Sequence, residues 1–437
     1  MTRQLKLVKL AKRVEPFRAL LFNRDRVGDL RDVVAPPYDL IGAERQNELY
    51  NRSPYNIVRL ELGREADRYA ASAATLARWR ADDILRVAPR PAIYLYTQLF
   101  EAGGRRLKRD GFVARVRLEN FSHGRILPHE KTFPAAKADR LKLLTALTTN
   151  VSSVFGLYSG KHAELDALIA NAATRAPLAD VVDDLGSGNQ LRVIEAPEEI
   201  ATVQNALESS LILIADGDHR YETALNYREI RRAAEADTGA LHAYDYTMMT
   251  LVGCDSPGLV ILPTHRVVKH LDASALASFE DRAREVFEIE EFADRDRMLA
   301  ELARGGRGAI GVGLRGAQAM RLLRLRDRQA LETALPQTPA VVRELDVSIL
   351  HALVFDRIFS VRPEAIKAGG NLEYTIDANG ALDAVSSGRA DGAFLMNPPS
   401  IEDVQRVSDS GATMPEKSTY FYPKLITGLF MNPLDVS

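Results

Sequence analysis

The sequence has almost no cysteine. Cys254 is the only one among 437 residues, and the eight histidines are scattered along the chain. A single thiol excludes an internal disulfide framework and a cysteine-rich zinc site. Neither an HExxH nor an HxxxH spacing occurs, so a histidine-based zinc site is not expected either. This cysteine usage is typical of a reducing compartment, and we expect a cytoplasmic protein.

An excess of charge and long apolar runs are also missing. Lysine and arginine number 57 against 59 acidic residues, so no global field attracts polyanions. Without a helix-turn-helix signal, nucleic acid is not an expected partner. No apolar run approaches the roughly 20 residues that cross a bilayer, and the N-terminus lacks a signal peptide's apolar core. We therefore expect an unexported protein without membrane spans.

The patterning that is present predicts an α+β fold. Hydrophobic residues make up 46% of the chain, which is typical of a globular protein. Alternation over Ala92–Phe100 predicts a hairpin with Gly103 and Gly104 at its tip. Apolar residues at helical spacing predict a helix over Ala135–Thr149, and a second hairpin turn is expected at Asp184–Gln190.

The domain organisation is expected to have three parts. Residues 1–270 form the core, 271–400 a smaller α/β lobe, and 401–437 a segment that returns to the core. Within the lobe we expect a helix over 274–286 with Ser274 as its N-cap. The stretch 373–400 predicts a strand, a turn at Asn379 and Gly380, a helix and a strand.

Two glycine motifs do not indicate a nucleotide-binding loop. Gly311–Gly316 matches G-x-G-x-x-G, but an alternating, arginine-bearing segment follows where a helix would be needed, so a hairpin is expected. Gly156–His162 is one residue short of a P-loop, and His162 stands where a serine or threonine should bind magnesium.

The stretch Leu211–Leu225 has the strongest chemical pattern. An apolar strand over Leu211–Ala215 runs into Asp216, Gly217 and Asp218, and strong helix formers follow. A helix N-terminus offers unpaired N–H donors, Gly217 allows a ligand to approach the backbone, and Arg220 adds a forked cation. These features suit a phosphate group.

Two carboxylates beside a phosphate would repel it. A divalent cation removes this conflict, since Mg²⁺ takes one or two carboxylates together with phosphate oxygens. We therefore expect Mg²⁺ at Asp216 and Asp218. The alternative is structural: Asp218 N-caps the helix while Asp216 pairs with Arg220.

Seven motifs resemble one family along nearly the whole chain. In order they are KRVEPFRALLF, VVAPPYDLI, SPYNIVRLEL, ILPHEKT, ADGDHRYETAL, LVILPTHRVV and PEKSTYFYPKLITGL. Together they resemble the prokaryotic family known as domain of unknown function 1015. Most members of that family carry a histidine where this chain has Asp218, which leaves the effect of this acid open.

The turn itself is similar to the nucleotide-binding turn of the ParB and sulfiredoxin superfamily. The related motifs are Gly-Glu-Arg-Arg in ParB CTPases, Gly-Cys-His-Arg in sulfiredoxins and Asp-Gly-His-Thr-Arg in archaeal free-serine kinases. Asp216, Gly217 and Arg220 match the kinase form. The resemblance implies a ParB/sulfiredoxin-like mixed-sheet core, whereas the absence of a cysteine in the turn excludes sulfiredoxin chemistry.

Three further segments supply candidate site residues. His129 or Glu130 could act as general base and Lys131 as a phosphate ligand; alternatively these charges are solvated at a helix entry. Tyr38 and Asp39 end a rigid turn where a base or ribose could bind. The remaining candidates form a substrate loop or a packed C-terminal closure: Lys417, Ser418 and Thr419.

These observations predict a Mg²⁺-dependent phosphotransferase that uses ATP or ADP, with CTP as another nucleotide, on a small hydroxyl compound. By resemblance, free serine is the nearest acceptor. Glu130 would take the acceptor proton, with His219 as the second candidate. The alternatives are a nucleotide-hydrolysing CTPase or ATPase switch that gates a partner, and a metal-dependent phosphatase. Homo-oligomerisation is left open.

Overall fold

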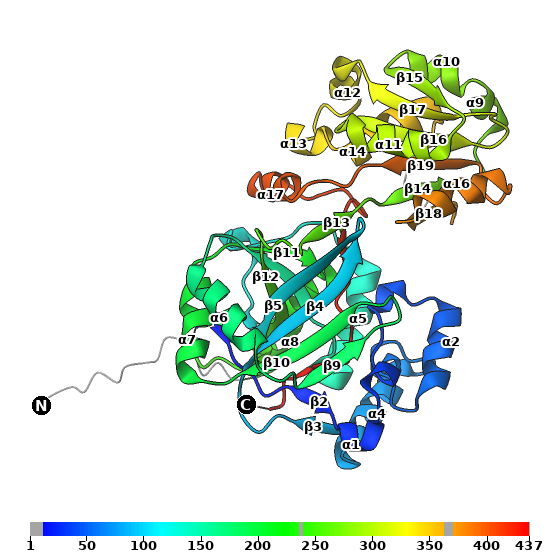
Figure 1. Cartoon of the computed structure of the whole chain (residues 1–437). Helices are drawn as coiled ribbons and strands as arrows, with labels where there is room; N and C mark the ends of the chain where they lie inside the picture. The colour runs from blue at the N-terminus through cyan, green and yellow to red at the C-terminus, as the bar shows by residue number, and fades with distance from the viewer. Residues whose placement is uncertain (1–11, 236–238, 362–369, 437) are drawn as a thin grey trace, which may run out of the picture. The chain divides into compact units, whose positions relative to one another are not determined.

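The computed structural model describes residues 12–235, 239–361 and 370–436 (Figure 1). The chain divides into two compact units. Unit 1 comprises the chain up to Pro128, Thr132–Val260 and the segment from Pro423 onward, and unit 2 comprises His129–Lys131 and Ile261–Tyr422. The segment expected to return to the core over 401–437 is thus divided after Tyr422.

Unit 1 is built on a nine-stranded mixed sheet. Its order is β6-β11-β8-β12-β5-β4-β10-β9, and β1 also pairs with β5. The pairs β6/β11 and β8/β12 are parallel and the others antiparallel. The strands are β1 Val14–Glu15, β4 Ile93–Ala102, β5 Arg105–Arg117, β6 Ile126–Leu127, β8 Val154–Tyr158, β9 Ala179–Val182, β10 Gly188–Ile194, β11 Ile212–Asp216 and β12 Tyr246–Gly253.

The expected hairpin between β4 and β5 is confirmed. Gly103 and Gly104 form its turn at φ +56° and +70°, a conformation that glycine adopts without a Cβ clash. Alternate residues of β4 enter opposite cores: Ile93 packs in one cluster and Tyr94 in the other. Both faces of the sheet are therefore buried.

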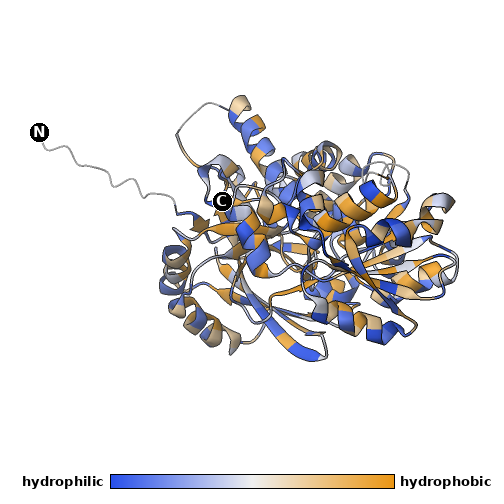
Figure 2. Cartoon of the chain, turned by 90° about the horizontal axis from the view of Figure 1, so that it is seen from above, coloured by the Kyte–Doolittle hydropathy of each residue, from blue (hydrophilic) through white to orange (hydrophobic). Residues whose placement is uncertain are grey.

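Helices cover both faces of this sheet. Leu165 of α6, Val203 of α7 and Tyr221 of α8 pack in the cluster of Ile93. Trp79 of α4 and Leu147 of α5 pack in the cluster on the other face. In Figure 2, helices carry both hydrophobic and hydrophilic residues, as is expected of amphipathic helices. The helices and short strands are α1 Arg24–Val27, α2 Ala43–Arg52, α3 Val58–Glu61, α4 Arg68–Ala81, α5 Pro134–Leu147, α6 Ala163–Ala173, α7 Pro197–Leu207, α8 Asp218–Ala234, η1 Leu30–Asp32, η2 Tyr38–Leu40, η3 Phe121–His123, η4 Ala243–Asp245, β2 Leu20–Phe22, β3 Leu85–Val87, β7 Thr149–Asn150 and β21 Asn432–Pro433.

Unit 2 contains a six-stranded antiparallel sheet in the order β15-β17-β16-β19-β14-β18. The G-x-G-x-x-G segment is the hairpin that the sequence predicts, formed by β16 and β17. The elements are β13 Val260–Leu262, β14 His265–Val268, β15 Phe287–Phe292, β16 Ala309–Leu314, β17 Met320–Leu325, β18 Leu372–Thr375, β19 Gly392–Met396, β20 Tyr420–Tyr422, α9 Ala273–Ala277, α10 Phe279–Arg284, α11 Arg295–Gly305, α12 Arg328–Ala334, α13 Ala340–Arg343, α14 Asp346–Ile349, η5 Leu350–Ile358, α16 Ala378–Ser386 and α17 Ile401–Asp409.

Two local expectations for unit 2 are wrong. The helix expected over 274–286 is broken into α9 and α10 at Ser278, and its N-cap is Asp272 rather than Ser274. The Asp272 carboxylate accepts two backbone N–H bonds, which satisfies more of the helix end than a hydroxyl would. Asn379 and Gly380 lie in the first turn of α16, because Asp377 caps that helix and accepts the N–H of Gly380.

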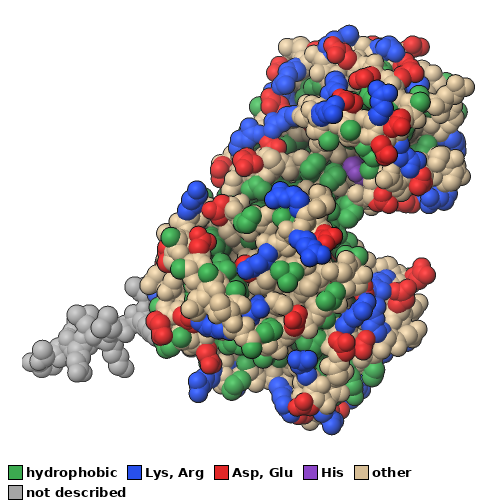
Figure 3. Space-filling view, in the orientation of Figure 1, with side chains coloured by type: hydrophobic (Ala, Val, Ile, Leu, Met, Phe, Trp, Pro, Cys, Tyr) green, Lys and Arg blue, Asp and Glu red, His purple; other side chains and the backbone are tan. Residues whose placement is uncertain are grey.

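The fold class is confirmed: a mixed-sheet α+β core with an additional α/β lobe. The kinship of this core to ParB and sulfiredoxin stays a prediction. Within the described residues, no helix combines the length and apolarity needed to cross a bilayer. On the face shown in Figure 3, basic and acidic side chains are interspersed, consistent with the near balance of charge in the sequence.

Candidate functional site

The strand–turn–helix elbow that the sequence predicts is present in unit 1. Strand β11 ends at Asp216, Gly217 adopts φ +100° and ψ 27°, and α8 begins at Asp218. The register of β11 against β8 shifts between Ile214 and Asp216, so the strand is irregular just before the turn. This irregularity and the left-handed glycine place the Asp216 side chain at the mouth of α8.

Two cations hold the Asp216 carboxylate. Arg220 donates to Oδ1 at 2.9 Å, and the Lys424 ammonium donates to Oδ2 at 2.5 Å. Arg220 also donates to the backbone carbonyl of Ser153. All three charged side chains are 14–19% exposed, so the cluster is shielded from bulk water yet not sealed from it.

Gly217 is required by the position of Arg220. A Cβ built on Gly217 would lie 2.9 Å from Arg220 Nε and 3.1 Å from its Cζ. The guanidinium therefore lies directly against the glycine backbone, in space that any side chain would fill. The sequence expectation that Gly217 allows close approach is met here by the protein's own arginine.

Lys424 is held in place by a buried network. The backbone carbonyl of Pro423 accepts a bond from Arg109, and that of Lys424 accepts one from Gln98 at 3.1 Å. Arg109 is 1% exposed, and burial lowers its pKa to about 10. The sheet thus fixes the C-terminal segment so that the Lys424 side chain reaches Asp216.

A second group of ionisable side chains lies close to Arg220. Burial opposes the charged form of Arg220, but Asp216, Tyr38, Asp39 and Glu61 together raise its pKa. The structure therefore brings Tyr38 and Asp39 near the elbow, whereas their contact with a base or ribose stays a prediction. Burial also raises the pKa of Tyr38 to about 12, so its hydroxyl stays protonated near neutral pH.

Glu61 and Arg140 complete this group, and the sequence analysis missed both. Arg140 lies over the Tyr38 ring at 4.0 Å and donates to Glu61 Oε1 at 3.1 Å. Glu61 Oε1 also accepts from the Ser152 hydroxyl at 3.2 Å. Glu61 is 3% exposed, and its Oε2 has no hydrogen-bond partner among the residues that the structure describes.

A small cavity of about 50 Å³ lies beside these residues. Its wall includes Glu61, Arg140, Ser152, Arg220 and Thr223. A buried carboxylate oxygen without a donor costs free energy, on the order of 1–3 kcal/mol, unless water or a ligand satisfies it. The cavity therefore offers a hydrogen-bond acceptor and a permanent cation side by side.

The structure excludes the N-cap role of Asp218, whereas the metal role of Asp218 and the catalytic role of His219 stay predictions. The N-cap of α8 is Gly217, so Asp218 is not the N-cap of the structural alternative. Asp218 is instead 1% exposed in the first helical turn. His219 Nε2 accepts the backbone N–H of Phe133 at 3.0 Å, which engages the lone pair that a general base would use.

The other predicted residues belong to unit 2. His129 Nε2 lies 2.9 Å from Thr419 Oγ1, and Glu130 forms an isolated bridge with Met414. Lys131 is exposed, whereas Ser418 is buried and donates to the carbonyl of Pro415. Lys417 has a positive φ of +53°. The catalytic and ligand roles of His129, Glu130, Lys131, Lys417, Ser418 and Thr419 stay predictions.

Both cations at the elbow bond to Asp216, and the expected Mg²⁺ at Asp216 and Asp218 stays a prediction. Each oxygen of the Asp216 carboxylate bonds to one cation, Oδ1 to Arg220 and Oδ2 to Lys424. Across the described ranges, no group of three or more histidine, cysteine, aspartate or glutamate side chains could hold a metal ion. The positive charge that the expected metal would supply is present as Arg220 and Lys424.

Comparison with known proteins yields one family and several solved structures. The family profile described as "Protein of unknown function (DUF1015)" matches residues 14–348. No curated protein matches the chain. The structure of a point mutant of a free serine kinase in complex with ADP is 12% identical, with a TM-score of 0.35, over 70% of this chain and 90% of that chain.

Two further structures are similar to a comparable degree. A conserved hypothetical protein from Pyrococcus furiosus is 12% identical, with a TM-score of 0.35, over 72% of this chain and 94% of its own. C-terminally truncated SbnI from Staphylococcus aureus is 11% identical, with a TM-score of 0.35, over 74% of this chain and 89% of its own. Similarity at this level gives no evidence about the activity of this chain.

Proposed function

The chain belongs to the DUF1015 family, and because that family is described only as proteins of unknown function, we propose an activity from the site itself. Unit 1 binds the phosphate tail of ATP or ADP at the elbow and transfers a phosphoryl group to a small hydroxyl compound. Arg220 and Lys424 bind the phosphates. Glu61 accepts a hydrogen bond, and then the proton, from the hydroxyl group of the second substrate.

The observation that carries this proposal is the pair of cations on one carboxylate. Arg220 and Lys424 converge on Asp216 from positions far apart in the chain, and both remain partly exposed. The two cations bond to the same carboxylate at the mouth of a 17-residue helix. The N-terminus of a helix adds backbone donors and a partial positive charge, which together favour a phosphate.

The cation pair also suits the transition state of phosphoryl transfer. Negative charge spreads over the oxygens of the transferred group, and catalysis comes mainly from positioning and electrostatic stabilisation. Arg220 supplies a planar fork for two oxygens, whereas Lys424 supplies a point charge. Asp216 keeps both cations in place before the nucleotide binds, so less reorganisation is needed when it arrives.

Glu61 gives the acceptor a place to bind in the same unit. Its Oε2 has no donor among the described residues, and it lines the cavity that Arg220 also lines. In the transfer, the terminal P–O bond of the nucleotide breaks as the acceptor oxygen bonds to phosphorus. The hydroxyl proton passes to Glu61 Oε2, and the shortened nucleotide leaves with the bridging oxygen. Any Mg²⁺ would enter with the nucleotide phosphates and neutralise part of their charge.

Nucleotide binding is tested by thermal unfolding with ATP, ADP, CTP and GTP, each with and without Mg²⁺. A ligand that binds only the folded state raises the melting temperature, and saturation at about 100 times Kd stabilises by about 2.7 kcal/mol. We expect a shift with ATP or ADP. Inorganic phosphate alone should give a smaller shift, because it occupies only part of the site. No shift with any nucleotide would contradict the proposal.

The phosphotransferase is then separated from the two alternatives by its products. Incubation with pooled amino acids, including serine, and sugar alcohols should make nucleotide consumption depend on the acceptor. Consumption without an acceptor would indicate the nucleotide-hydrolysing switch instead. Release of phosphate from phosphorylated compounds in the absence of nucleotide would indicate the phosphatase.

Replacing Glu61 by glutamine should separate chemistry from binding. Glu61→Gln keeps an oxygen for Arg140 and Ser152 but cannot take a proton. We expect the nucleotide-induced thermal shift to remain, while acceptor-dependent consumption falls by about 100-fold or more, the range typical of general-base removal. Glu199→Gln is the control, because Glu199 in unit 1 also pairs with an arginine, Arg175, but is less buried than Glu61 and lies outside the cavity wall. Unchanged turnover in Glu61→Gln would remove Glu61 from the mechanism.

A further inference from the structure

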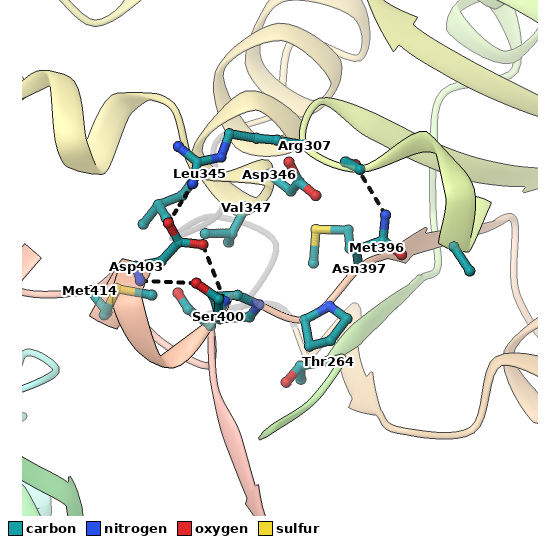
Figure 4. A pocket seen from close by; sticks show the side chains of 15 residues that line it. Thr264, Arg307, Leu345, Asp346, Val347, Met396, Asn397, Ser400, Asp403 and Met414 are labelled. Atoms are coloured by element: carbon teal, nitrogen blue, oxygen red, sulfur yellow. Dashed lines mark hydrogen bonds and ion pairs between the residues drawn. The ribbon is translucent and has the colours of Figure 1, made fainter. Parts of the chain in front are cut away.

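Unit 2 contains a separate cavity of about 490 Å³ (Figure 4). Its lining comes from the ends of α11 and α14, from the segment after β19 and from the start of α17. The volume lies within the roughly 300–1,000 Å³ of small-molecule sites. Asp216, Arg220, Lys424 and Glu61, on which the proposed function rests, do not line it, so the cavity is independent of that function; Ser418, a candidate from the sequence, lies on its wall.

The wall of this cavity is mainly apolar. Leu345, Val347, Met396 and Met414 contribute side chains, and Pro398 and Pro399 contribute rings. Such a surface favours the carbon skeleton of an organic ligand over a bare ion. Figure 4 shows Met396 beside Asp346 and Asn397, so that apolar and polar groups share one side of the cavity.

Three polar groups on the wall remain available to a ligand. Asp346 accepts the N–H of Gly308 at 2.7 Å through Oδ1, and its second oxygen has no donor among the described residues. Asn397 uses its amide nitrogen to donate to Leu302 and Gly306, which fixes its oxygen as an acceptor. Thr264 is 6% exposed, and its buried hydroxyl has no partner in the described part of the chain.

The charged neighbours of Asp346 are occupied elsewhere. Arg307 pairs with Asp403, and Asp403 also bonds to Ser400 and Arg406 in the capping of α17. No basic side chain in the described ranges forms an ion pair with Asp346. The wall of the cavity therefore carries the Arg307–Asp403 ion pair, the Asp346 carboxylate, which forms no ion pair within the described ranges, and two uncharged hydrogen-bonding groups.

We propose that this cavity binds a small organic cation, an ammonium group on a short apolar skeleton. The ammonium donates to Asp346 and Asn397, and the skeleton packs against Met396 and Met414. A carboxylate ligand is disfavoured because Asp346 would repel it. A bare divalent cation would fill little of the volume and leave the apolar wall unused.

Titration of Asp346 gives a second readout. Burial raises its pKa to about 6, with Arg307 and the Gly308 N–H opposing this rise and Asp403 adding to it. A raised pKa means that the folded state favours the neutral acid, so the ionised form of Asp346 destabilises the fold above about pH 6. The free energy of unfolding should therefore increase as the pH falls through that value. Ligand affinity should change in the opposite direction and weaken as Asp346 becomes protonated.

The proposal is tested by nuclear magnetic resonance on the full chain with ¹³C-methyl methionine. The sequence has eight methionines, and Met396 and Met414 line the cavity while Met248 and Met249 lie in unit 1. The probes are n-propylammonium, n-propanol and propionate, which share one skeleton, and MgCl₂. We expect n-propylammonium to shift Met396 and Met414 saturably, n-propanol to bind at least tenfold more weakly, and propionate and MgCl₂ to cause no saturable shift.

Asp346→Asn is the decisive variant because it keeps an oxygen for Gly308 and removes the unpaired charge. It should weaken n-propylammonium binding at least tenfold and raise the melting temperature at pH 8. Asp383→Asn, on the exposed side of α16 and paired with Arg295, should leave binding unchanged. Equal shifts with propionate, a response to Mg²⁺ but not to n-propylammonium, or full binding by Asp346→Asn would each overturn the proposal.

Discussion

Replacing Arg220 by alanine is expected to abolish nucleotide-induced stabilisation of unit 1. Arg220 bonds to Asp216 at 2.9 Å and to the Ser153 carbonyl, and it lines the cavity beside α8. A phosphate contacting its fork gains charge-assisted hydrogen bonds, each contributing about 1.5–3 kcal/mol. Loss of two such bonds should weaken nucleotide binding about 100-fold or more, measured as Kd by calorimetry or by thermal titration.

The variant should still fold. Asp216 keeps its bond to Lys424, so the carboxylate is not left without a cation. Lys424→Met tests the other cation and should weaken binding by a smaller factor, since it removes a point charge rather than a bidentate fork. Arg45→Ala is the control, because Arg45 of unit 1 is also an ion-paired arginine, but its partners, Glu48 and Asp184, are not elbow residues. Normal nucleotide shifts in both elbow variants would refute the proposed phosphate site.

Replacing Gly217 by alanine is expected to have a comparably large effect. At φ +100° a Cβ is strained, and the new methyl group would lie 2.9 Å from Arg220 Nε. The backbone strain should cost on the order of 1–2 kcal/mol of folding stability. Displacement of the guanidinium should in addition weaken nucleotide binding at least tenfold, observed by the same titrations.

Gly186→Ala separates these two consequences. Gly186 also has a positive φ, +81°, in unit 1, but a Cβ there meets nothing within 4 Å. It should lose stability to a similar extent and bind nucleotide normally. If both variants bind nucleotide equally well, the position of Arg220 is not what makes Gly217 necessary.

The elbow could be predicted from the sequence because its parts are local. Strand, left-handed turn and helix follow one another within Ile212–Ala234, and each is set by short-range apolar pattern, glycine and helix propensity. The pairing of Asp216 with Arg220 is an i,i+4 contact on the first turns of the helix. It was one of the alternatives that the sequence left open.

The hydrogen-bond partner of Asp216 Oδ2, Lys424, could not be predicted in this way. Lys424 is 208 positions away, and it reaches the elbow only because Arg109 and Gln98 hold the carbonyls of the C-terminal segment. The expectation of Mg²⁺ rested on two carboxylates without enough visible cations. The fold supplies the missing positive charge from a distant segment, and it buries Asp218 in the first turn of α8.

Glu61 and Arg140 were missed for a related reason. In the sequence they are ordinary members of amphipathic segments, since most glutamates and arginines lie in solvent. Only packing of α3 and α5 on the same face of the sheet makes them a buried pair beside Tyr38. Burial is a tertiary property, and it is what turns Glu61 Oε2 into an acceptor without a donor among the described residues.

The sequence by itself determined the α+β class, the family and the backbone of the strand–turn–helix elbow, because apolar periodicity, glycine positions and short motifs act over a few residues. The tertiary structure alone decided which cations face Asp216, which carboxylates lack partners in the described part of the chain and where unit 2 holds its cavity. Those features depend on side chains that come from distant parts of the chain. Burial removes the water that would otherwise hydrogen-bond to these charged groups, so they must find partners in the protein or in a ligand.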